Sequence, residues 1–205
     1  MGFWNDHAVP RIIAVACNTK HEREIRARVC KDLRGKTLEI GFGSGLNIPF
    51  YPPAVTDVVA VEPSPVSRKL AARRIEESSV PISYCGPDAQ VLSVEDGRFD
   101  SVLSTYTLCT IPDPRAALCE LLRVLRPGGQ LRFAEHGRSR DAKVARRQDR
   151  LDRLQCRLAG GCHVTRNIPA LIRDAGFTIE DLSTYYAEGA PRYAGYMFEG
   201  WATKL

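Results

Sequence analysis

The stretch of sequence that decides the fold is Leu38-Glu39-Ile40-Gly41-Phe42-Gly43-Ser44-Gly45. An apolar, strand-like run ends at Ile40, and three glycines at alternate positions follow it directly. Glycines at such a turn let the backbone bend sharply and let a ligand come close to the main chain. The dinucleotide-binding turn has the spacing G-x-G-x-x-G, but its third glycine position is Leu46 here. Glu39 would also repel a pyrophosphate, so the motif favours a ligand that carries a cationic group.

Strand-like and helix-like segments alternate around this turn. Strands are predicted at Thr37–Phe42, Asp57–Glu62, Ile82–Cys85, Phe99–Ser104 and Gln130–Glu135. Helices are predicted at Ser64–Ser78, in a short segment after Asp88, and at Pro114–Arg126. One more helix, with Ile25, Val29 and Leu33 on one face, is predicted before the first strand. This alternation predicts an α/β fold with a doubly wound, Rossmann-like, mostly parallel sheet.

The last part of the chain departs from this alternation. A helix is predicted at Arg166–Ala175, and two strand-like runs follow it at Phe177–Tyr186 and Tyr193–Thr203. Only Gly189-Ala190-Pro191 and its neighbours separate these two runs, which leaves no room for a helix. We therefore expect a C-terminal antiparallel hairpin at the edge of the sheet.

Length and composition limit the class of protein. The chain has 205 residues, 44% of them hydrophobic and 26% charged, which is typical of one globular domain. We expect a single domain over residues 1–205, with an N-terminal helical cap over 1–34 and a helical insertion near the substrate site over 137–165. No apolar run approaches the roughly 20 residues of a membrane-spanning helix.

The cysteines indicate where the protein resides. There are seven, an odd number, and no two of them form a CxxC pair. This usage predicts reduced thiols in a cytoplasmic protein. The spacing of a zinc site is absent as well, so the sequence predicts no metal site.

The net charge of +5 is concentrated in one segment. Residues Arg138–Arg157 hold eight basic residues and three aspartates, and the rest of the chain is neutral on balance. Val144, Leu151, Leu154 and Leu158 recur within it at helical spacing, which predicts an amphipathic helix with a basic outer face. This face is either simply solvated or makes weak peripheral contact with an anionic membrane. Nucleic acid is not expected, because no aromatic residues lie between the basic ones.

Two acidic residues follow the glycine-rich turn at informative positions. Glu62 ends the second predicted strand, 17 residues after Gly45, where a carboxylate accepts both hydroxyls of a ribose. Asp88 comes just after the third strand and is placed to reach an adenine amino group. The carboxyl ends of parallel strands meet at one edge of a sheet, so these residues predict an adenosine site.

These motifs make the chain resemble the class I S-adenosylmethionine-dependent methyltransferases, specifically the small type 11 group. The resemblance runs from about Thr37 to Glu135 and includes Phe99-Asp100-Ser101-Val102 and Leu125-Arg126-Pro127-Gly128-Gly129. It implies that the cofactor is S-adenosylmethionine. It also implies a binding site for the amino acid end at Glu39, Gly41, Gly43 and Gly45, for the ribose at Glu62 and Pro63, for the adenine at Asp88 and Ala89, and for the methyl-donating end at Thr105 and Tyr106.

The second half of the chain resembles a narrower group, the methyltransferase-like thiol S-methyltransferases. The matching segments are Leu108–Pro112, Phe133–His136 and Gly161–Arg166. This resemblance implies that the methyl acceptor is a small lipophilic thiol. An O- or C-methyltransferase acting on a phenol, quinol or heterocycle is the alternative, and its cofactor half would be the same. A non-catalytic cofactor-binding scaffold and a nicotinamide oxidoreductase are further alternatives, and the sequence carries no signal for an oligomeric state.

The predicted chemistry needs few catalytic groups. Methyl transfer from a sulfonium is an in-line displacement, so the protein supplies alignment and, for a protonated nucleophile, a base. His136 is the best candidate base because it ends the fifth predicted strand, at the same edge as the cofactor site, and His163 is a weaker one. Tyr106, Tyr185 and Tyr186 are candidates for the wall of a substrate pocket. No Asn/Asp-Pro-Pro-Tyr element follows the fourth strand, which argues against a nucleic-acid acceptor and for a small molecule.

Overall fold

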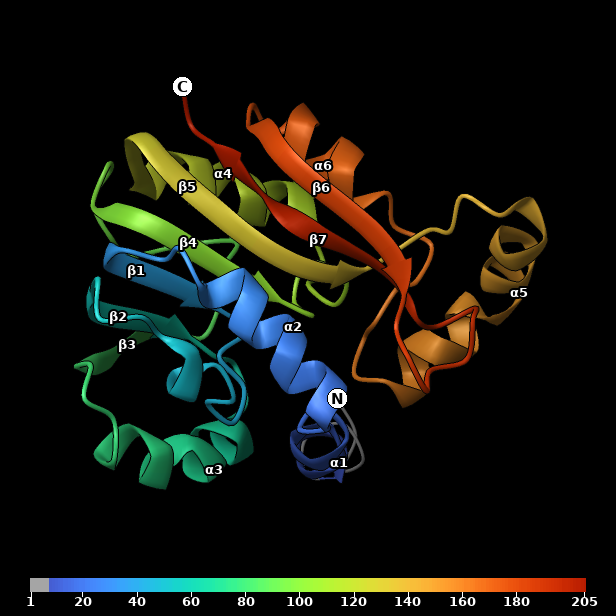
Figure 1. Cartoon of the computed structure of the whole chain (residues 1–205), viewed down its shortest axis with the longest axis horizontal. Coiled ribbons are helices and arrows are strands. Elements are labelled where there is room, and N and C mark those ends of the chain that lie inside the picture. The colour runs from blue at the N-terminus through green and yellow to red at the C-terminus, as the bar shows by residue number, and fades with distance from the viewer. Residues whose placement is uncertain (1–7) are drawn as a thin grey trace.

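The protein is described by a computed structural model of residues 8–205, so the first seven residues of the predicted N-terminal cap lie outside the described residues. A seven-stranded sheet forms its centre, in the order β3-β2-β1-β4-β5-β7-β6 (Figure 1). The strands are β1 (Gly35–Ile40), β2 (Val55–Val61), β3 (Ile82–Gly86), β4 (Phe99–Thr105), β5 (Leu125–His136), β6 (Thr178–Tyr186) and β7 (Tyr196–Thr203). The first five are parallel, and β7 is antiparallel to both β5 and β6. The predicted doubly wound sheet with a C-terminal antiparallel pair is therefore confirmed.

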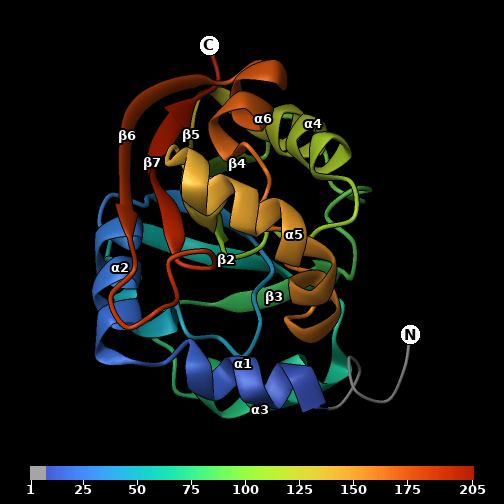
Figure 2. The same cartoon turned by 90° about the vertical axis from the view of Figure 1, so that its right-hand side faces the viewer.

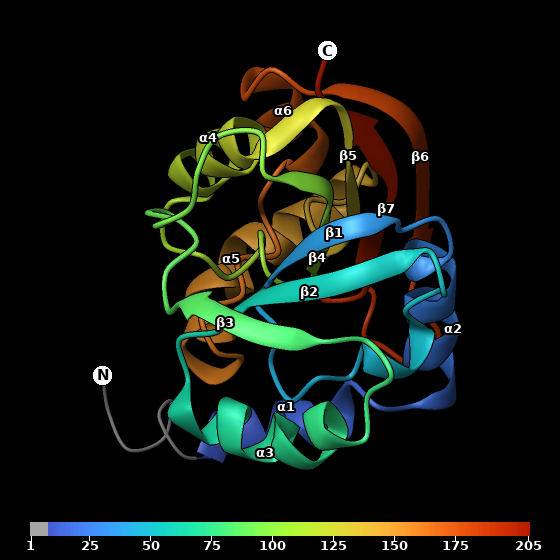
Figure 3. The same ribbon diagram turned by 90° about the vertical axis from the view of Figure 1, so that its left-hand side faces the viewer.

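Helices cover both faces of this sheet. They are α1 (Val9–Ala16), α2 (Lys20–Cys30), α3 (Pro65–Glu76), α4 (Pro114–Val124), α5 (Ala142–Leu158) and α6 (Ile168–Asp174), with a short 3-10 helix, η2 (Ile48–Phe50). Figure 2 shows α4 and α6 side by side at one end of the molecule and α1 beside α3 at the other, with α5 between them. Figure 3 shows α2 against the opposite face of the sheet, where it packs on β5.

The core consists of two layers, one on each face of the central strands. Leu38 and Val102 lie in the layer beneath α4, and Leu103 lies in the layer that α2 covers. Ile25 and Val29 of α2 are buried in that second layer, as their spacing predicted. Parallel strands covered on both faces are buried at consecutive residues instead of at alternate ones, and the second halves of β1, β2 and β4 show this burial.

Two local predictions differ from the structure. No helix follows Asp88, because its carboxylate accepts the backbone N–H and the side-chain amide of Gln90, and such a local bond competes with helix formation. The fifth strand begins at Leu125 and not at Gln130, because Leu125 pairs with Phe99 ahead of a register shift. Gly128 also donates its N–H to the carbonyl of Lys204, so the turn before Gln130 is held by the C-terminal residues.

Between residues 8 and 205, no helix has both the length and the apolar character that crossing a bilayer requires.

Candidate active site

The glycine-rich turn after β1 has the geometry that its sequence predicted. Gly41, Gly43 and Gly45 all have positive φ, between 59° and 75°, a region that other residues rarely adopt. A Cβ atom at Gly41 would lie 1.9 Å from Oγ1 of Thr107, so the protein itself fills that space. At Gly43 the nearest atom is 3.8 Å away, the carbonyl oxygen of Gly41. A ligand can therefore reach the main chain at Gly43, in a space that a side chain there would fill.

Glu62, at the end of β2, faces this turn. Its Oε2 accepts the N–H of Gly43 at 2.7 Å and its Oε1 accepts the N–H of Ser64 at 2.8 Å. Burial raises the pKa of Glu62, against the effect of these two bonds. Each carboxylate oxygen keeps a second lone pair, so the group can still accept two hydroxyls. The residues of this site therefore fit the ribose of S-adenosylmethionine, with Pro63 beside it.

The predicted adenine residues lie at the carboxyl end of β3, the neighbour of β2. Asp88 is exposed, and its Oδ1 accepts both bonds from Gln90, while Ala89 is buried. The remaining oxygen of Asp88 is the group that could accept an adenine amino group. Its role stays a prediction.

A buried polar network underlies the turn. Glu39 of β1 is fully buried, and its carboxylate accepts the amide of Asn47 at 2.9 Å and the hydroxyl of Tyr51. Asn47 also donates to Oγ1 of Thr105, and the buried guanidinium of Arg26 donates to Asn47 and Thr105 at 2.7 and 3.2 Å. Arg26 was not among the site residues predicted from the sequence. The sequence offers one indication that Arg26 is buried, because it lies four residues before Cys30 on the buried face of α2.

Glu39 gives the site a testable pH dependence. Burial raises the pKa of its carboxyl to about 7, although the bonds from Tyr51 and Asn47 oppose the shift. If the carboxylate attracts the amino group of S-adenosylmethionine, binding requires the ionised form and releases a proton below this pKa. We therefore expect affinity to fall about tenfold per pH unit below about pH 7 and to level off above it. Calorimetry at pH 6, 7 and 8 measures this. Glu39→Gln should bind more weakly and show no such trend, whereas a trend unchanged in this variant would contradict the role of Glu39.

A second group of side chains lies at the ends of β4 and β5. Tyr106 has a φ of 58°, the one positive value for a non-glycine among the described residues, and such backbone strain clusters at functional sites. Its ring lies 4.9 Å from that of His136. Nδ1 of His136 is 3.8 Å from Sγ of Cys162, which is 3.7 Å from Sγ of Cys109. These two cysteines were not predicted as site residues from the sequence, because they come from loops 53 positions apart.

Glu135 holds the loop that carries Cys109. It is fully buried and accepts the hydroxyl of Ser104 at 2.7 Å and the N–H groups of Thr107 and Cys109 at 3.0 and 3.2 Å. Thr107 in turn fills the space beside Gly41. Thr107 therefore joins the glycine-rich turn to the loop that carries Cys109.

The ionisable groups of Cys109, His136 and Cys162 shift one another's pKa. Hydrogen bonding with Cys109 and with His136 lowers the pKa of Cys162, and burial opposes that shift. The same bond between the thiols, together with burial, raises the pKa of Cys109. Burial acts to lower the pKa of His136, but the neighbouring Cys162 and Glu135 outweigh it, so the net shift is upward. The interactions within the cluster therefore shift the pKa of Cys162 downward and that of His136 upward.

The other predicted acceptor-site residues lie elsewhere. His163 bonds through Nδ1 to Asp152 of α5 at 2.7 Å, and its Nε2 lies 3.4 Å from Sγ of Cys156. Tyr185 donates to Glu199 at 2.5 Å, and Tyr186 shares a hydrogen bond with Ser139. Of the candidate wall residues, only Tyr106 lies against His136.

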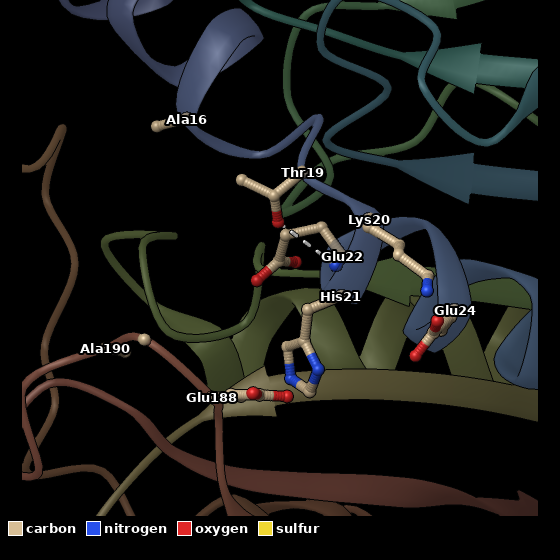
Figure 4. A pocket seen from close by; sticks show the side chains of 9 residues that line it. Ala16, Thr19, Lys20, His21, Glu22, Glu24, Glu188 and Ala190 are labelled. Carbon is tan, nitrogen blue, oxygen red and sulfur yellow. Dashed lines mark hydrogen bonds between the residues drawn. The ribbon is translucent and has the colours of Figure 1, made fainter.

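A pocket of about 610 Å³ opens between the α1–α2 turn and the β6–β7 loop. Figure 4 shows Glu22 and His21 on one side of it and Glu188 on the other. The carboxylate of Glu22 raises the pKa of Tyr106, after the larger effect of burial, so this pocket adjoins the Tyr106 side of the site. Its volume is adequate for a small molecule.

Comparison with known proteins gives a consistent result. Residues 38–133 match the model of a family described as "Methyltransferase domain". The chain is 33% identical to the thiol S-methyltransferase TMT1B of Rattus norvegicus over 77% of this chain and 67% of that protein. It is 35% identical to the demethylmenaquinone methyltransferase of Renibacterium salmoninarum over 49% of this chain and 40% of that protein. The fold is that of the N-methyltransferase NodS from Bradyrhizobium japonicum WM9, solved with S-adenosyl-L-homocysteine. Its TM-score is 0.72 over 98% of both chains, at 17% identity.

Proposed function

Because the chain belongs to the S-adenosylmethionine-dependent methyltransferases, we propose that it transfers a methyl group to a small lipophilic thiol. The observation that supports a thiol as the methyl acceptor is the extent of the sequence similarity to known methyltransferases. The match to the rat thiol S-methyltransferase covers 77% of this chain, whereas the match to the demethylmenaquinone methyltransferase covers 49%. The longer match reaches beyond the half of the chain that would hold the cofactor, and the acceptor is selected outside that half.

The residues have separate roles in this proposal. S-adenosylmethionine supplies a methyl group already activated on a sulfonium. Glu62 holds its ribose through the carboxylate, the main chain at Gly43 holds its amino acid end, and Glu39 attracts its amino group. Thr105, the last residue of β4, and Tyr106, which follows it, face the methyl-donating end. His136, in contact with the Tyr106 ring, assists removal of the acceptor's proton.

An acceptor screen tests the proposed function. Purified protein is incubated with methyl-labelled S-adenosylmethionine and a panel of alkyl thiols, phenols and quinols. We expect the highest kcat/KM on a lipophilic thiol. Faster transfer to a quinol would favour the C-methyltransferase alternative. Cofactor binding without transfer to any acceptor would favour the scaffold.

We also propose that α5 gives the protein weak contact with an anionic membrane. Arg146, Arg147, Arg150 and Arg153 are exposed, and within residues 8–205 no carboxylate forms an ion pair with them. Leu154 and Leu158 are more than half exposed on the same helix. A Cβ atom at Gly160 would lie 3.1 Å from Val9, so the end of α5 adjoins the exposed apolar residues of α1. Basic residues beside exposed apolar ones are typical of a surface that binds at a lipid interface. A cytosolic location is part of this proposal, supported by the seven free cysteines.

Vesicle sedimentation tests this contact. Replacing Arg146, Arg147, Arg150 and Arg153 with Gln should abolish binding to vesicles that contain an anionic lipid, because each arginine contributes about 1 kcal/mol there. The binding of the unmodified chain should also weaken with salt. The matched control removes the same charge by replacing Arg34, Arg73, Arg98 and Arg115, which are exposed elsewhere. Equal loss in both variants, or no binding at low salt, would leave α5 as a solvated helix.

A further inference from the structure

The Cys109–His136–Cys162 cluster brings together three groups that ligate soft divalent metals. Their ligand atoms all lie within 4.8 Å of one another. The two sulfurs are 3.7 Å apart, and Nδ1 of His136 is 3.8 Å from Sγ of Cys162. A tetrahedral zinc ion with Zn–S bonds of about 2.3 Å and Zn–N bonds of about 2.0 Å separates its ligand atoms by about 3.5–3.8 Å. Two of the three separations in the cluster therefore match those of a zinc coordination shell.

The surroundings of the cluster hold its loops in place. Cys109 donates its N–H to Glu135, and its carbonyl accepts the N–H of His163 at 2.8 Å. The second of these bonds ties the Cys109 loop to the loop that carries Cys162. Cys109 and Cys162 are 1% and 5% exposed, so the sulfurs are shielded from bulk solvent. The two cysteines are therefore held on loops that are fixed relative to each other.

The Cys109–His136–Cys162 cluster offers a metal ion three protein ligands and not four. Structural zinc sites use four, whereas catalytic zinc sites use three and leave one position for water or substrate. A set of two cysteines and one histidine is of the catalytic kind. His136 lies against Tyr106, which follows the strand expected to face the methyl donor, and Thr107 joins the Cys109 loop to the cofactor turn. An ion here would lie at the boundary between the cofactor and acceptor sites.

We propose that Cys109, His136 and Cys162 bind a zinc ion whose fourth position takes the sulfur of the thiol acceptor. This inference rests on the proposed function, and it gives His136 the role of ligand rather than free base. The acceptor R–SH binds through sulfur and loses its proton to solvent. A sulfur lone pair then forms a bond to the methyl carbon while the bond from that carbon to the sulfonium breaks. The electron pair of the broken bond stays on the sulfur of S-adenosylhomocysteine, and the thioether leaves the metal.

Metal content tests the site independently of activity. The protein is purified under a non-chelating reductant, loaded with zinc chloride, desalted and analysed for zinc. We expect about one zinc per chain, and at least a tenfold reduction in Cys109→Ser and in Cys162→Ser. Cys119→Ser is the matched control, because Cys119 is exposed on α4 and away from the cluster. Cobalt loading should give thiolate-to-cobalt absorption in the unmodified chain and in the control only.

Several outcomes would overturn this inference. One is a substoichiometric zinc content in the correctly folded, reduced chain. Another is equal zinc in the two cluster variants and in Cys119→Ser, and a third is a Cys109–Cys162 disulfide that, once reduced, still takes up no metal. If a variant does not fold, the affinity of the unmodified chain for zinc, measured against a chromogenic chelator, decides instead, and weak binding overturns the site. Thiol transfer at full rate without zinc would reject the metal and leave the proposed function standing. Zinc binding without methyl transfer to a thiol would reject the thiol as the acceptor.

Discussion

Gly43→Val is expected to abolish the binding of S-adenosylmethionine while the chain still folds. A Cβ atom at Gly43 would lie no closer than 3.8 Å to the protein atoms around it, so the added side chain starts in open space and occupies the space that the ligand needs. The N–H of Gly43 also donates to Glu62, and a branched side chain at a φ of +59° strains that arrangement. Calorimetric titration with the cofactor is the measurement.

A second glycine separates loss of the ligand site from backbone strain. Gly128 has a φ of +72°, and like Gly43 it has open space where a Cβ atom would lie. It lies near the start of β5, far from the edge of the sheet where the cofactor is expected to bind. A β-branched residue in this region costs about 1–2 kcal/mol or more at either position. We therefore expect Gly128→Val and Gly43→Val to lose similar thermal stability, and only the second to lose cofactor binding. Measurable affinity in Gly43→Val, or equal loss in both variants, would contradict the assignment of this turn.

The cofactor half could be predicted from the sequence because its signals are contiguous. The turn from Gly41 to Gly45 and the acidic residue at Glu62 are each defined by their position after a strand. Parallel strands bring those positions to one edge, so the contact of Glu62 with Gly43 follows from order alone. The family and the fold could be inferred from these residues, and the comparisons confirm both.

The cluster that we propose for the acceptor side could not be predicted in the same way. Cys109, His136 and Cys162 come from three separate segments, and no spacing between them indicates that they meet. Their contact depends on Glu135, which holds one loop, and on the bond from His163 to Cys109, which holds the other. Arg26 illustrates the same limit, since its partners Asn47 and Thr105 are 21 and 79 residues away. Propensity and periodicity describe local structure, and these contacts are decided by tertiary packing.

His136→Ala is expected to lower methyl transfer to a lipophilic thiol by about 10²–10⁴-fold, because the thiol is no longer activated, whether His136 removes its proton directly or holds the zinc ion that acidifies it. Cofactor affinity should stay the same, because within residues 8–205 His136 makes no contact with the glycine turn or with Glu62. Single-turnover rates with a thiol and with a phenol, for the unmodified chain and the variant, measure the effect. Calorimetry on the same samples provides the cofactor affinity.

The order of the two losses identifies the role of His136. A free base matters most for a phenol, because a phenol with a pKa of about 10 is almost fully protonated near neutral pH, whereas a thiol with a pKa of about 8.5 is already partly ionised. A metal ligand matters most for the thiol, because sulfur is the softer ligand and gains more from coordination to zinc. We therefore expect the thiol to lose more rate than the phenol. A larger loss with the phenol would instead make His136 a general base, and equal rates on both acceptors would show that alignment alone drives the transfer.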